Sequence, residues 1–359
     1  MSAKTEPALR QHAARLHTHT RDSLDLDLNG AAHALTARTH FQHRAAIHAA
    51  DRTELLAALN DLANGTPSSE AVYNTAPAQP KVVFVFPGQG SQWPAMATEL
   101  LQTAPAFADH IRACHDALAP HTTWSLLDLL TNPDPEALNH VDVVQPALFA
   151  VMTSLAHHYR TTYGIVPHAV IGHSQGEIAA AYTAGALTLH HAAQIIAQRS
   201  LALTTLQNTG TMASIPLPHD QIPAQRDLHI AAVNGPSTTI VSGPTEVLEE
   251  LVADYNGRNV QARLIPVNYA SHSAYIDSIR ERLLTTIEDI SPRTSEIPFH
   301  STVLAEEFDT EGLDPDYWYR NARHTVRFQE TIHNLLNTGH TLFIETSPHP
   351  VLTTAIQDT

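Results

Sequence analysis

Runs of apolar residues that end at glycines mark out strands and helices along most of the chain. Residues 81–86 (KVVFVF) and 168–172 (HAVIG) are each typical of a buried strand that enters a turn. Residues 145–159 (QPALFAVMTSLAHHY) and 176–186 (GEIAAAYTAGA) are typical of buried helices. Because strands alternate with helices, the pattern predicts an α/β fold whose large subdomain is α/β-hydrolase-like and has a parallel central sheet.

Between residues 210 and 267 the pattern changes to short strands. Four apolar runs occur there, and a helical stretch at 245–257 precedes the last of them. This order, with a short first helix, predicts a small ferredoxin-like βαββαβ subdomain inserted into the large one. From residue 268 onward, two helical stretches and a strand return to the large subdomain. The four runs are 212–218 (MASIPLP), 228–235 (LHIAAVNG), 238–244 (TTIVSGP) and 260–267 (VQARLIPV).

The first 80 residues predict a separate α+β domain. Residues 38–50 have strand character, and Asp51 followed by Glu54 resembles a capping box that opens a helix, which Gly65 would close. Residues 66–80 are rich in Pro, Ser and Ala and predict a linker. The expected organisation is a domain at 1–80, a large subdomain at 81–209 and 268–359, and a small subdomain at 210–267.

Composition indicates a soluble globular protein. The 359 residues are 43% hydrophobic and 16% charged, and no apolar run approaches the roughly 20 residues that a membrane helix needs. The N-terminus lacks the apolar segment of a signal peptide, and the single cysteine, Cys114, cannot form an internal disulfide, so we expect a cytoplasmic location. Thirty-six acidic residues against 20 Lys and Arg give a formal charge of −16, which argues against nucleic acid as a partner.

The 25 histidines raise the question of a metal site. Pairs occur at His157-His158 and His190-His191, but the histidines are scattered and lack an HExxH helix or a companion CxxC. We therefore expect no metal.

Ser174 lies between two glycines in the sequence GHSQG, after a predicted strand and before a predicted helix. Gly172 and Gly176 would allow strand and helix to pack closely around a tight turn that exposes a nucleophilic serine. The motif alone also fits an ordinary glycine-containing corner. The decision depends on which partners the chain supplies to the serine.

His272 is the best-placed base, at the end of the predicted small subdomain. A hydrolase would also need an acid between serine and histidine in the chain; Asp227 and Asp254 are candidates, but neither follows a strand in the expected way. A Ser–His dyad therefore fits better. Backbone N–H groups in GQGSQ (88–92), together with that of Gln175, could form an oxyanion hole.

Arg199 distinguishes among classes of substrate. It occurs within an otherwise apolar helical stretch, AAQIIAQRSLAL, where a guanidinium needs a partner. It could be a surface charge or helix-end cap, or it could bind the carboxylate of a substrate. An acyl donor of the malonate type carries such a carboxylate. An esterase that acts on neutral esters would have no use for this guanidinium.

Several blocks together resemble the acyltransferase domain of modular type I polyketide synthases, in that family's order over residues 81–359. Residues 1–80 resemble the linker that joins the preceding ketosynthase to this domain. The blocks are FPGQGSQW (86–93), VDVVQPALFAV (141–151), GHSQGEIAAA (172–181), Arg199, YASH (269–272) and YWYRNARHTVRF (317–328).

The resemblance implies a ping-pong reaction with no tightly bound cofactor. An acyl group would pass from a CoA thioester to the serine, and then to the phosphopantetheine thiol of an acyl carrier protein; the adjacent ketosynthase would be a further partner. The implied roles are Ser174 as nucleophile, His272 as general base and acid, Arg199 as carboxylate ligand, Gln89 and Gln175 as backbone N–H donors to the oxyanion, and Asn321 as the residue whose backbone oxygen orients His272.

The resemblance also bears on the acyl group. YASH resembles domains that select methylmalonyl units, whereas malonyl-selective ones resemble HAFH, and Ser271 in place of phenylalanine leaves room for an α-methyl group. The expected specificity pocket comprises Tyr269, Ser271, Gln145 and His173. Malonyl or ethylmalonyl use remains open, as do a serine hydrolase of the α/β type and a catalytically silent docking module.

Overall fold

The computed structural model describes residues 1–77, 79–132, 134–225 and 227–359. It contains two compact units, Met1–Pro80 and Lys81–Thr359. Each unit has its own hydrophobic core, so each is described by itself.

The first unit packs helices on a small antiparallel sheet. Its strands β1 (Ser2–Ala3), β2 (His43–Ile47) and β3 (Ala71–Thr75) lie in that order in the sheet. Leu9 of the first helix and Leu59 of the third are fully buried in the core. The helices are α1 (Glu6–Asp22), α2 (Leu28–Thr36) and α3 (Arg52–Asn64).

Local signals place α3 as the sequence predicts. Asp51 accepts a hydrogen bond from the Glu54 N–H at 2.9 Å, and Gly65 ends the helix in the left-handed conformation at φ 71°. The linker expected at 66–80 is partly wrong, because it contains β3, which pairs with β2 over five residues. The flanking Pro and Ser residues obscure this strand in the sequence; residue 78 lies outside the described part.

The second unit is built on a five-stranded sheet. The order is β11-β10-β5-β4-β12, with β10, β5, β4 and β12 parallel and β11 antiparallel to its neighbour. The predicted parallel central sheet is therefore confirmed. The strands are β4 (Lys81–Phe86), β5 (Ala169–Gly172), β10 (Phe299–Ser301), β11 (Glu306–Glu307) and β12 (His340–Glu345).

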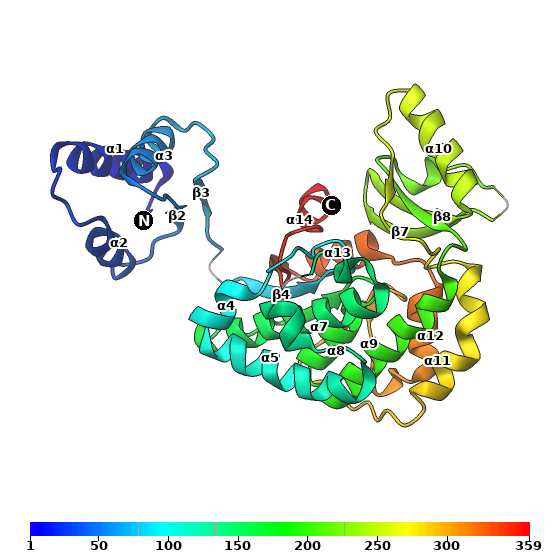
Figure 1. Cartoon of the computed structure of the whole chain (residues 1–359). Coiled ribbons are helices and arrows are strands. Elements are labelled where there is room, and N and C mark those ends of the chain that lie inside the picture. The colour runs from blue at the N-terminus through cyan, green and yellow to red at the C-terminus, as the bar shows by residue number, and fades with distance from the viewer. Residues whose placement is uncertain (78, 133, 226) are drawn as a thin grey trace. The chain divides into compact units, whose positions relative to one another are not determined.

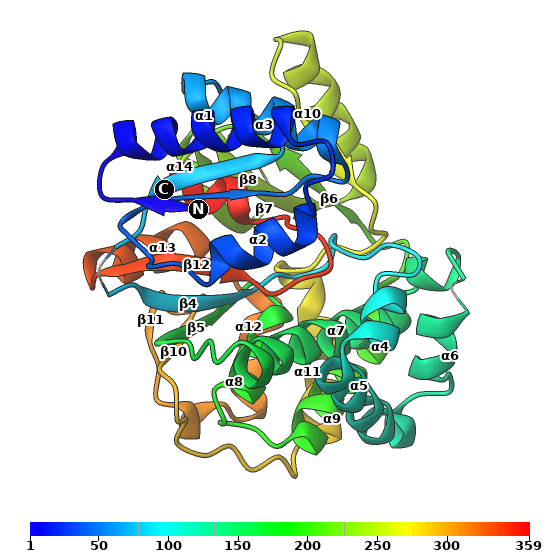
Figure 2. The same ribbon diagram turned by 90° about the vertical axis from the view of Figure 1, so that its left-hand side faces the viewer.

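The side chains of β4 alternate between the two faces of this sheet. Phe84 and Phe86 belong to a core shared with α5, α7, α8 and α9, whereas Val83 and Val85 pack with α13 and the small subdomain. Figure 2 shows α5, α7, α8 and α9 on one side of the sheet and α13 on the other. The helices of the large subdomain are α4 (Thr98–Thr103), α5 (Pro105–Leu118), α6 (Leu126–Thr131), α7 (Val141–Thr162), α8 (Gly176–Thr183), α9 (Leu189–Leu203), α11 (Arg280–Thr286), α12 (Pro315–Arg323), α13 (Phe328–Asn337) and α14 (Thr353–Asp358).

The small subdomain is an antiparallel sheet of order β7-β8-β6-β9. This is the ferredoxin-like order that the sequence predicts. The expected short first helix is a 3₁₀ turn at His219–Gln221, and α10 (Thr245–Gly257) covers one face of the sheet (Figure 1). The strands are β6 (Thr211–Ile215), β7 (His229–Gly235), β8 (Thr238–Gly243) and β9 (Arg263–Ile265).

A main-chain bridge joins the two subdomains. Val326, between α12 and α13, accepts a hydrogen bond from the Val233 N–H and donates one to the Ala231 carbonyl, both at 2.9 Å. The segment that follows α12 thereby continues alongside β7 of the small sheet.

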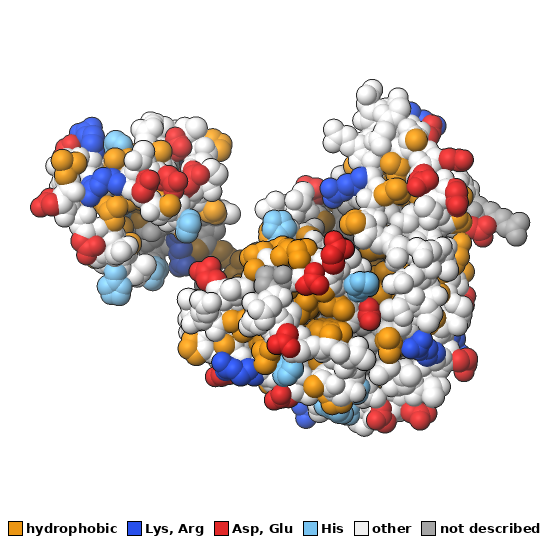
Figure 3. Space-filling view, in the orientation of Figure 1, with side chains coloured by type: hydrophobic (Ala, Val, Ile, Leu, Met, Phe, Trp, Pro, Cys, Tyr) orange, Lys and Arg blue, Asp and Glu red, His pale blue; other side chains and the backbone are white. Residues whose placement is uncertain are grey.

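Acidic side chains outnumber scattered cations on one face of the second unit. On the face of residues 81–359 drawn in Figure 3, Lys and Arg side chains are separated from one another, while Asp and Glu are more frequent. Such a face offers no continuous track for a polyanion. No helix within the described ranges has the length and apolar character required to traverse a bilayer.

A buried histidine connects three helices of the second unit. On α5, His110 Nδ1 lies 2.9 Å from the Ser154 hydroxyl of α7, and its Nε2 lies 2.8 Å from the Tyr182 hydroxyl of α8. Burial lowers the pKa of His110 from 6.5 to about 4, so the ring is neutral in the folded protein near neutrality.

We predict that acidification weakens this unit through His110. The unfolded chain takes up a proton below pH 6.5 that the folded protein excludes until about pH 4, so the free energy of unfolding falls as pH drops through that window. His110→Gln should make this pH dependence shallower. Urea unfolding followed by tryptophan fluorescence measures it, because Trp93, Trp124 and Trp318 all lie in this unit. Equal pH dependence in wild type, His110→Gln and the exposed control His333→Gln would contradict the prediction.

Candidate active site

Ser174 occupies a strained turn between β5 and α8. Its φ of 55° lies in the left-handed region, which non-glycine residues rarely adopt. A Cβ atom on Gly172 would lie 2.1 Å from the Glu177 nitrogen, and one on Gly176 would lie 2.0 Å from the Phe86 oxygen. Both positions therefore require glycine, and the resulting close packing presents the serine at the end of the sheet.

The side chain of His272 forms a hydrogen bond with this serine. Its Nε2 lies 2.8 Å from Ser174 Oγ, and its Nδ1 lies 2.8 Å from the backbone oxygen of His324. A carbonyl oxygen can only accept, so Nδ1 carries the ring hydrogen. Nε2 is then free to accept the proton of the serine hydroxyl, which is the tautomer that a general base needs.

The orienting carbonyl corrects one residue assignment. The resemblance implied the backbone oxygen of Asn321, but the carbonyl facing Nδ1 belongs to His324. Asn321 is still inside α12, where carbonyls point along the helix axis, whereas His324 is the extended residue that ends the helix. Of the two candidate acids, Asp254 is paired instead with Arg258, the residue that ends α10, at 2.7 Å.

Arg199 lies beside Ser174 and is only 1% exposed. Its Nη2 donates to Ser174 Oγ and its Nη1 to Gln145 Oε1, both at 3.1 Å. Burial lowers the pKa of Arg199 to about 10, so it remains cationic near neutrality. Within the described residues Nε has no partner, and no carboxylate lies within ion-pair distance of the guanidinium. Glu177 acts on this cation only electrostatically. A buried cation without a directly paired anion is costly, which points to an anionic ligand.

Two of the four predicted pocket residues extend this polar network. Gln145 Nε2 donates to the Tyr269 hydroxyl at 3.4 Å, and that hydroxyl donates to Gln89 Oε1 at 3.0 Å. Burial raises the pKa of Tyr269 to about 12, so its hydroxyl keeps its hydrogen. The network links Arg199 to the loop that follows β4.

The other two pocket residues are placed differently. His173 Nε2 lies 2.8 Å from Asn234 Oδ1 on β7, so this ring connects the elbow to the small subdomain and is no part of the Arg199 network. Ser271 is buried, between Tyr269 and His272 in the chain.

The loop after β4 lies against the elbow. A Cβ on Gly88 would be 3.3 Å from the His173 oxygen and 3.8 Å from Ser174 Cβ. Among the described residues, the backbone N–H groups of Gln89 and Gln175 have no hydrogen-bond partner, whereas that of Gly90 donates to Gln92 Oε1 at 2.8 Å. The two unpaired N–H groups are thus available to a ligand.

Sequence reasoning missed Glu177, a completely buried carboxylate three residues after Ser174. It accepts hydrogen bonds from Thr302, Tyr317 and the side chain of Asn321. Burial raises the pKa of its carboxyl group, against the effect of these hydrogen bonds. A glutamate inside the apolar run GEIAAA was the available signal, because such a group must find buried partners. In the described part of the chain, no cluster of three or more His, Cys, Asp or Glu side chains could hold a metal ion.

Comparison with protein families gives two matches. Residues 83–359 match the family described as acyl transferase domain, and residues 1–59 match one described as CurL-like, PKS C-terminal. Among curated proteins, the chain is 47% identical over 366 residues to polyketide synthase GfsA of Streptomyces halstedii and 47% identical over 365 residues to mycoketide-CoA synthase of Mycobacterium tuberculosis (strain ATCC 25618 / H37Rv). Each alignment covers 100% of this chain but only 5% and 9% of those proteins, so the chain spans a small part of these relatives.

Solved structures give a similar result. The acyltransferase domain from module 8 of the salinomycin polyketide synthase superposes with a TM-score of 0.90 at 45% identity, covering 100% of this chain and 86% of that one. A loading acyltransferase from the avermectin modular polyketide synthase superposes with a TM-score of 0.74 at 46% identity, covering 77% and 90% of the two chains.

The environment of His272 predicts an unusual pH dependence. Burial, with a smaller contribution from Arg199, lowers the pKa of His272 from 6.5 to about 3, so the ring stays neutral as pH falls through 6.5. The rate at which a fluorophosphonate labels Ser174 should therefore stay level through pH 6.5. In Arg199→Ala the loss of the nearby cation raises the pKa of His272, so labelling should decline at a higher pH than in wild type. A wild-type decline centred at pH 6.5 would contradict this, and Ser174→Ala controls for labelling elsewhere.

Proposed function

The chain belongs to the acyltransferase domains of polyketide synthases, and we propose that it transfers a methylmalonyl extender unit from CoA to the phosphopantetheine thiol of an acyl carrier protein. The transfer runs through an acyl ester on Ser174. As a member of this family the protein is a transferase enzyme. The proposal names the acyl group, the donor, the acceptor and the covalent intermediate.

The Ser–His geometry supports a two-step reaction. His272 Nε2 removes the hydroxyl proton while Ser174 Oγ forms a bond to the thioester carbonyl carbon, giving a tetrahedral oxyanion. When the C–S bond breaks, the imidazolium returns its proton to the departing CoA sulfur and leaves the acyl-serine. In the second step the pantetheine thiol gives its proton to His272 and attacks the ester, and Ser174 leaves with that proton.

Two features support stabilisation of the intermediate. The backbone N–H groups of Gln89 and Gln175 are the donors that we assign to the oxyanion, because they flank the serine and are otherwise unpaired. The carbonyl that orients His272 is that of His324. It stabilises the ring without adding a negative charge to a site that must admit an anionic acyl group.

One observation carries the choice of substrate class: among the described residues, no carboxylate forms an ion pair with the buried guanidinium of Arg199 beside Ser174. Glu177 acts on Arg199 only electrostatically and is hydrogen-bonded to other groups. A carboxylate at the α-carbon of the acyl group would supply the missing partner and could accept from Nη1 or Nη2 and from the unpaired Nε. A neutral ester would leave the guanidinium unpaired. The arrangement therefore favours malonate-type acyl groups over simple esters.

The side chains of the YASH segment favour methylmalonyl. Ser271 is small and buried. In the HAFH segment of malonyl-selective domains, a phenylalanine would fill the same position. A methyl group contributes only about 1 to 3 kcal/mol in such a contact, so malonyl and ethylmalonyl are the competing substrates. Tyr269, Gln145 and His173 complete the proposed specificity set.

The partners of the domain follow from its family. We assign residues 1–80 as the linker to a preceding ketosynthase domain, in line with the match of residues 1–59 to a polyketide synthase family. The acyl carrier protein presents the accepting thiol. No tightly bound cofactor takes part in the proposed steps.

The proposal predicts the mass of the acyl-enzyme. When the protein is mixed with equal concentrations of malonyl-CoA and methylmalonyl-CoA, intact-mass spectrometry should show mainly the methylmalonyl adduct, and Ser174→Ala should show none. Addition of a carrier protein bearing phosphopantetheine should move the acyl group to that protein. A dominant malonyl adduct would overturn the choice of acyl group, and loss of the adduct to water as fast as to the thiol would indicate a hydrolase.

The role of Arg199 predicts a change in substrate class. Arg199→Ala removes the partner of a buried carboxylate, so its kcat/KM for methylmalonyl-CoA should fall roughly 100- to 1000-fold. Its use of propionyl-CoA, which has no carboxylate, should rise relative to wild type. Arg258→Ala, which alters an exposed arginine just after α10, is the matched control and should leave both values unchanged. Equal losses for the two acyl groups in Arg199→Ala would rule out the carboxylate role.

A further inference from the structure

Glu177 receives four hydrogen bonds in the interior of the second unit. Its Oε1 accepts from the Thr302 N–H at 2.5 Å and from the Thr302 hydroxyl at 2.7 Å. Its Oε2 accepts from the Tyr317 hydroxyl at 2.7 Å and from Asn321 Nδ2 at 2.9 Å. The carboxylate on the first turn of α8 thus holds the residue that follows β10 and two residues of α12. None of the proposed catalytic steps uses this group.

We propose that Glu177 is a positioning residue, which holds α12 against the nucleophile elbow so that the His324 carbonyl faces His272. The inference rests on the proposed acyl transfer for its kinetic consequence. It adds Glu177 to the residues that determine the tautomer of His272.

The first link is the side-chain amide of Asn321. Its Nδ2 donates one hydrogen to Glu177 Oε2 and the other to the Ser174 backbone oxygen, at 3.1 Å. Rotating the amide by 180° would place Oδ1 against these two acceptors, so the hydrogen bonds fix its orientation. Asn321 therefore connects the main chain of the nucleophile to the carboxylate and to α12.

The second link is the end of α12, which holds the base at two points. The Ala322 carbonyl accepts from the His272 backbone N–H at 3.0 Å, and the His324 carbonyl faces its Nδ1 at 2.8 Å. His272 has a φ of 56°, so its strained backbone depends on these contacts. A shift of α12 would move both acceptors together.

The third link closes the arrangement from the far side. The Thr302 carbonyl accepts from the Arg327 N–H at 2.8 Å, beyond the residues that hold His272. Glu177 therefore fixes the segment 321–327 near its start, through Asn321, and near its end, through Thr302. Three of the four donors to the carboxylate are side-chain groups, so single substitutions can remove them.

The test uses two variants that leave the reacting groups intact. Glu177→Gln has one acceptor oxygen in place of two, so two of the four donors face an NH₂ group. Asn321→Ala removes the bridging amide and leaves a residue with high helix propensity. In both, the maximal rate of acyl-enzyme formation from methylmalonyl-CoA should fall roughly 10- to 100-fold, because the base is displaced by a fraction of an ångström. The half-saturating concentration should stay within about twofold, because Arg199 and its partners are untouched.

A spectroscopic measurement tests the positioning without any acyl donor. In ¹⁵N-histidine-labelled protein, the signals that disappear in His272→Ala identify this ring. The wild type should show the Nδ1–H tautomer, whereas both variants should show a mixture of tautomers. If the wild type shows this tautomer but forms no acyl adduct, the proposed function fails while the positioning role stands.

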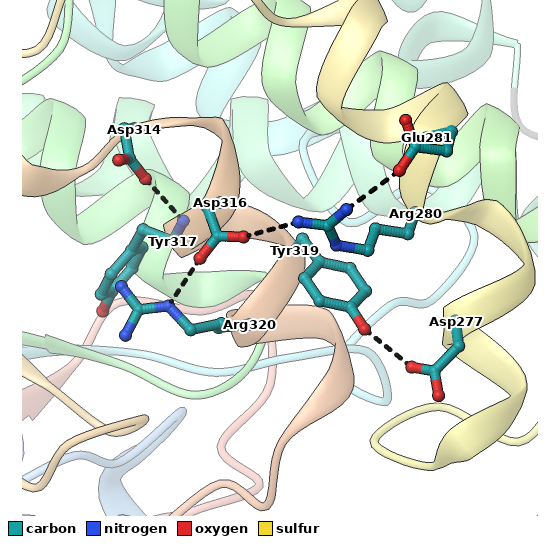
Figure 4. A network of polar contacts seen from close by, with 8 residues as sticks. All are labelled: Asp277, Arg280, Glu281, Asp314, Asp316, Tyr317, Tyr319 and Arg320. Atoms are coloured by element: carbon teal, nitrogen blue, oxygen red, sulfur yellow. Dashed lines mark hydrogen bonds and ion pairs between the residues drawn. The ribbon is translucent and has the colours of Figure 1, made fainter.

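Asp314→Ala is the matched control for a merely structural effect. Asp314 caps the same helix, because it accepts a hydrogen bond from the Tyr317 N–H at 2.7 Å. Figure 4 shows Asp314 at the start of α12, near Asp316, which forms ion pairs with Arg280 and Arg320. Its loss should lower the melting temperature but leave the tautomer and the maximal rate within about twofold of wild type. An unchanged rate and tautomer in folded Glu177→Gln and Asn321→Ala would overturn the inference. So would an Asp314→Ala variant that loses as much rate as they do at an equal loss of melting temperature.

Discussion

The distance between α8 and the end of β4 governs the geometry of the site. The helix approaches so closely that a single methyl group at residue 176 would collide with the Phe86 carbonyl oxygen. This approach forces Ser174 into the left-handed conformation and presents its hydroxyl to His272. It also brings the loop that follows β4 against the elbow. The positions of Ser174, His272 and the two unpaired N–H groups therefore depend on one backbone contact.

Exclusion of water gives the side chains of this site their properties. Burial lowers the pKa of His272 far below its usual value, so the ring stays neutral and able to accept a proton over a wide span of pH. The same burial lowers the pKa of Arg199 to about 10, yet the group stays cationic near neutrality and has no carboxylate paired with it among the described residues. Under the proposed function the neutral imidazole and the unpaired cation are complementary, because the carboxylate that would neutralise Arg199 would arrive with the acyl group. The positive charge of Arg199 would thus be unpaired only until the acyl group binds.

The sequence predicts those site residues whose own side chains, or those of their neighbours, form a recognisable pattern. Ser174 follows from its glycines, and Arg199 from the cost of a charge within an apolar helix, and the parallel sheet follows from buried apolar runs. The strand β3 was missed because its pairing with β2 is a long-range property that Pro and Ser neighbours conceal. The His324 carbonyl was missed for a different reason. Every residue carries a carbonyl, so only the path of the backbone at the end of α12 shows which one faces the base.

The bridge between Val326 and β7 determines how interchangeable the small subdomain is. Both of its hydrogen bonds join main-chain atoms, so they carry no side-chain identity. The bridge begins two residues after the carbonyl that faces the base. A chimera that replaces β6 to β9 with the equivalent cassette from a homologue therefore retains this junction whatever its sequence, provided that the grafted strand keeps its length and register. The hydrogen bond between His173 and Asn234 and the apolar packing of the small subdomain against Val83 and Val85 do depend on side chains, so such a graft must preserve them deliberately.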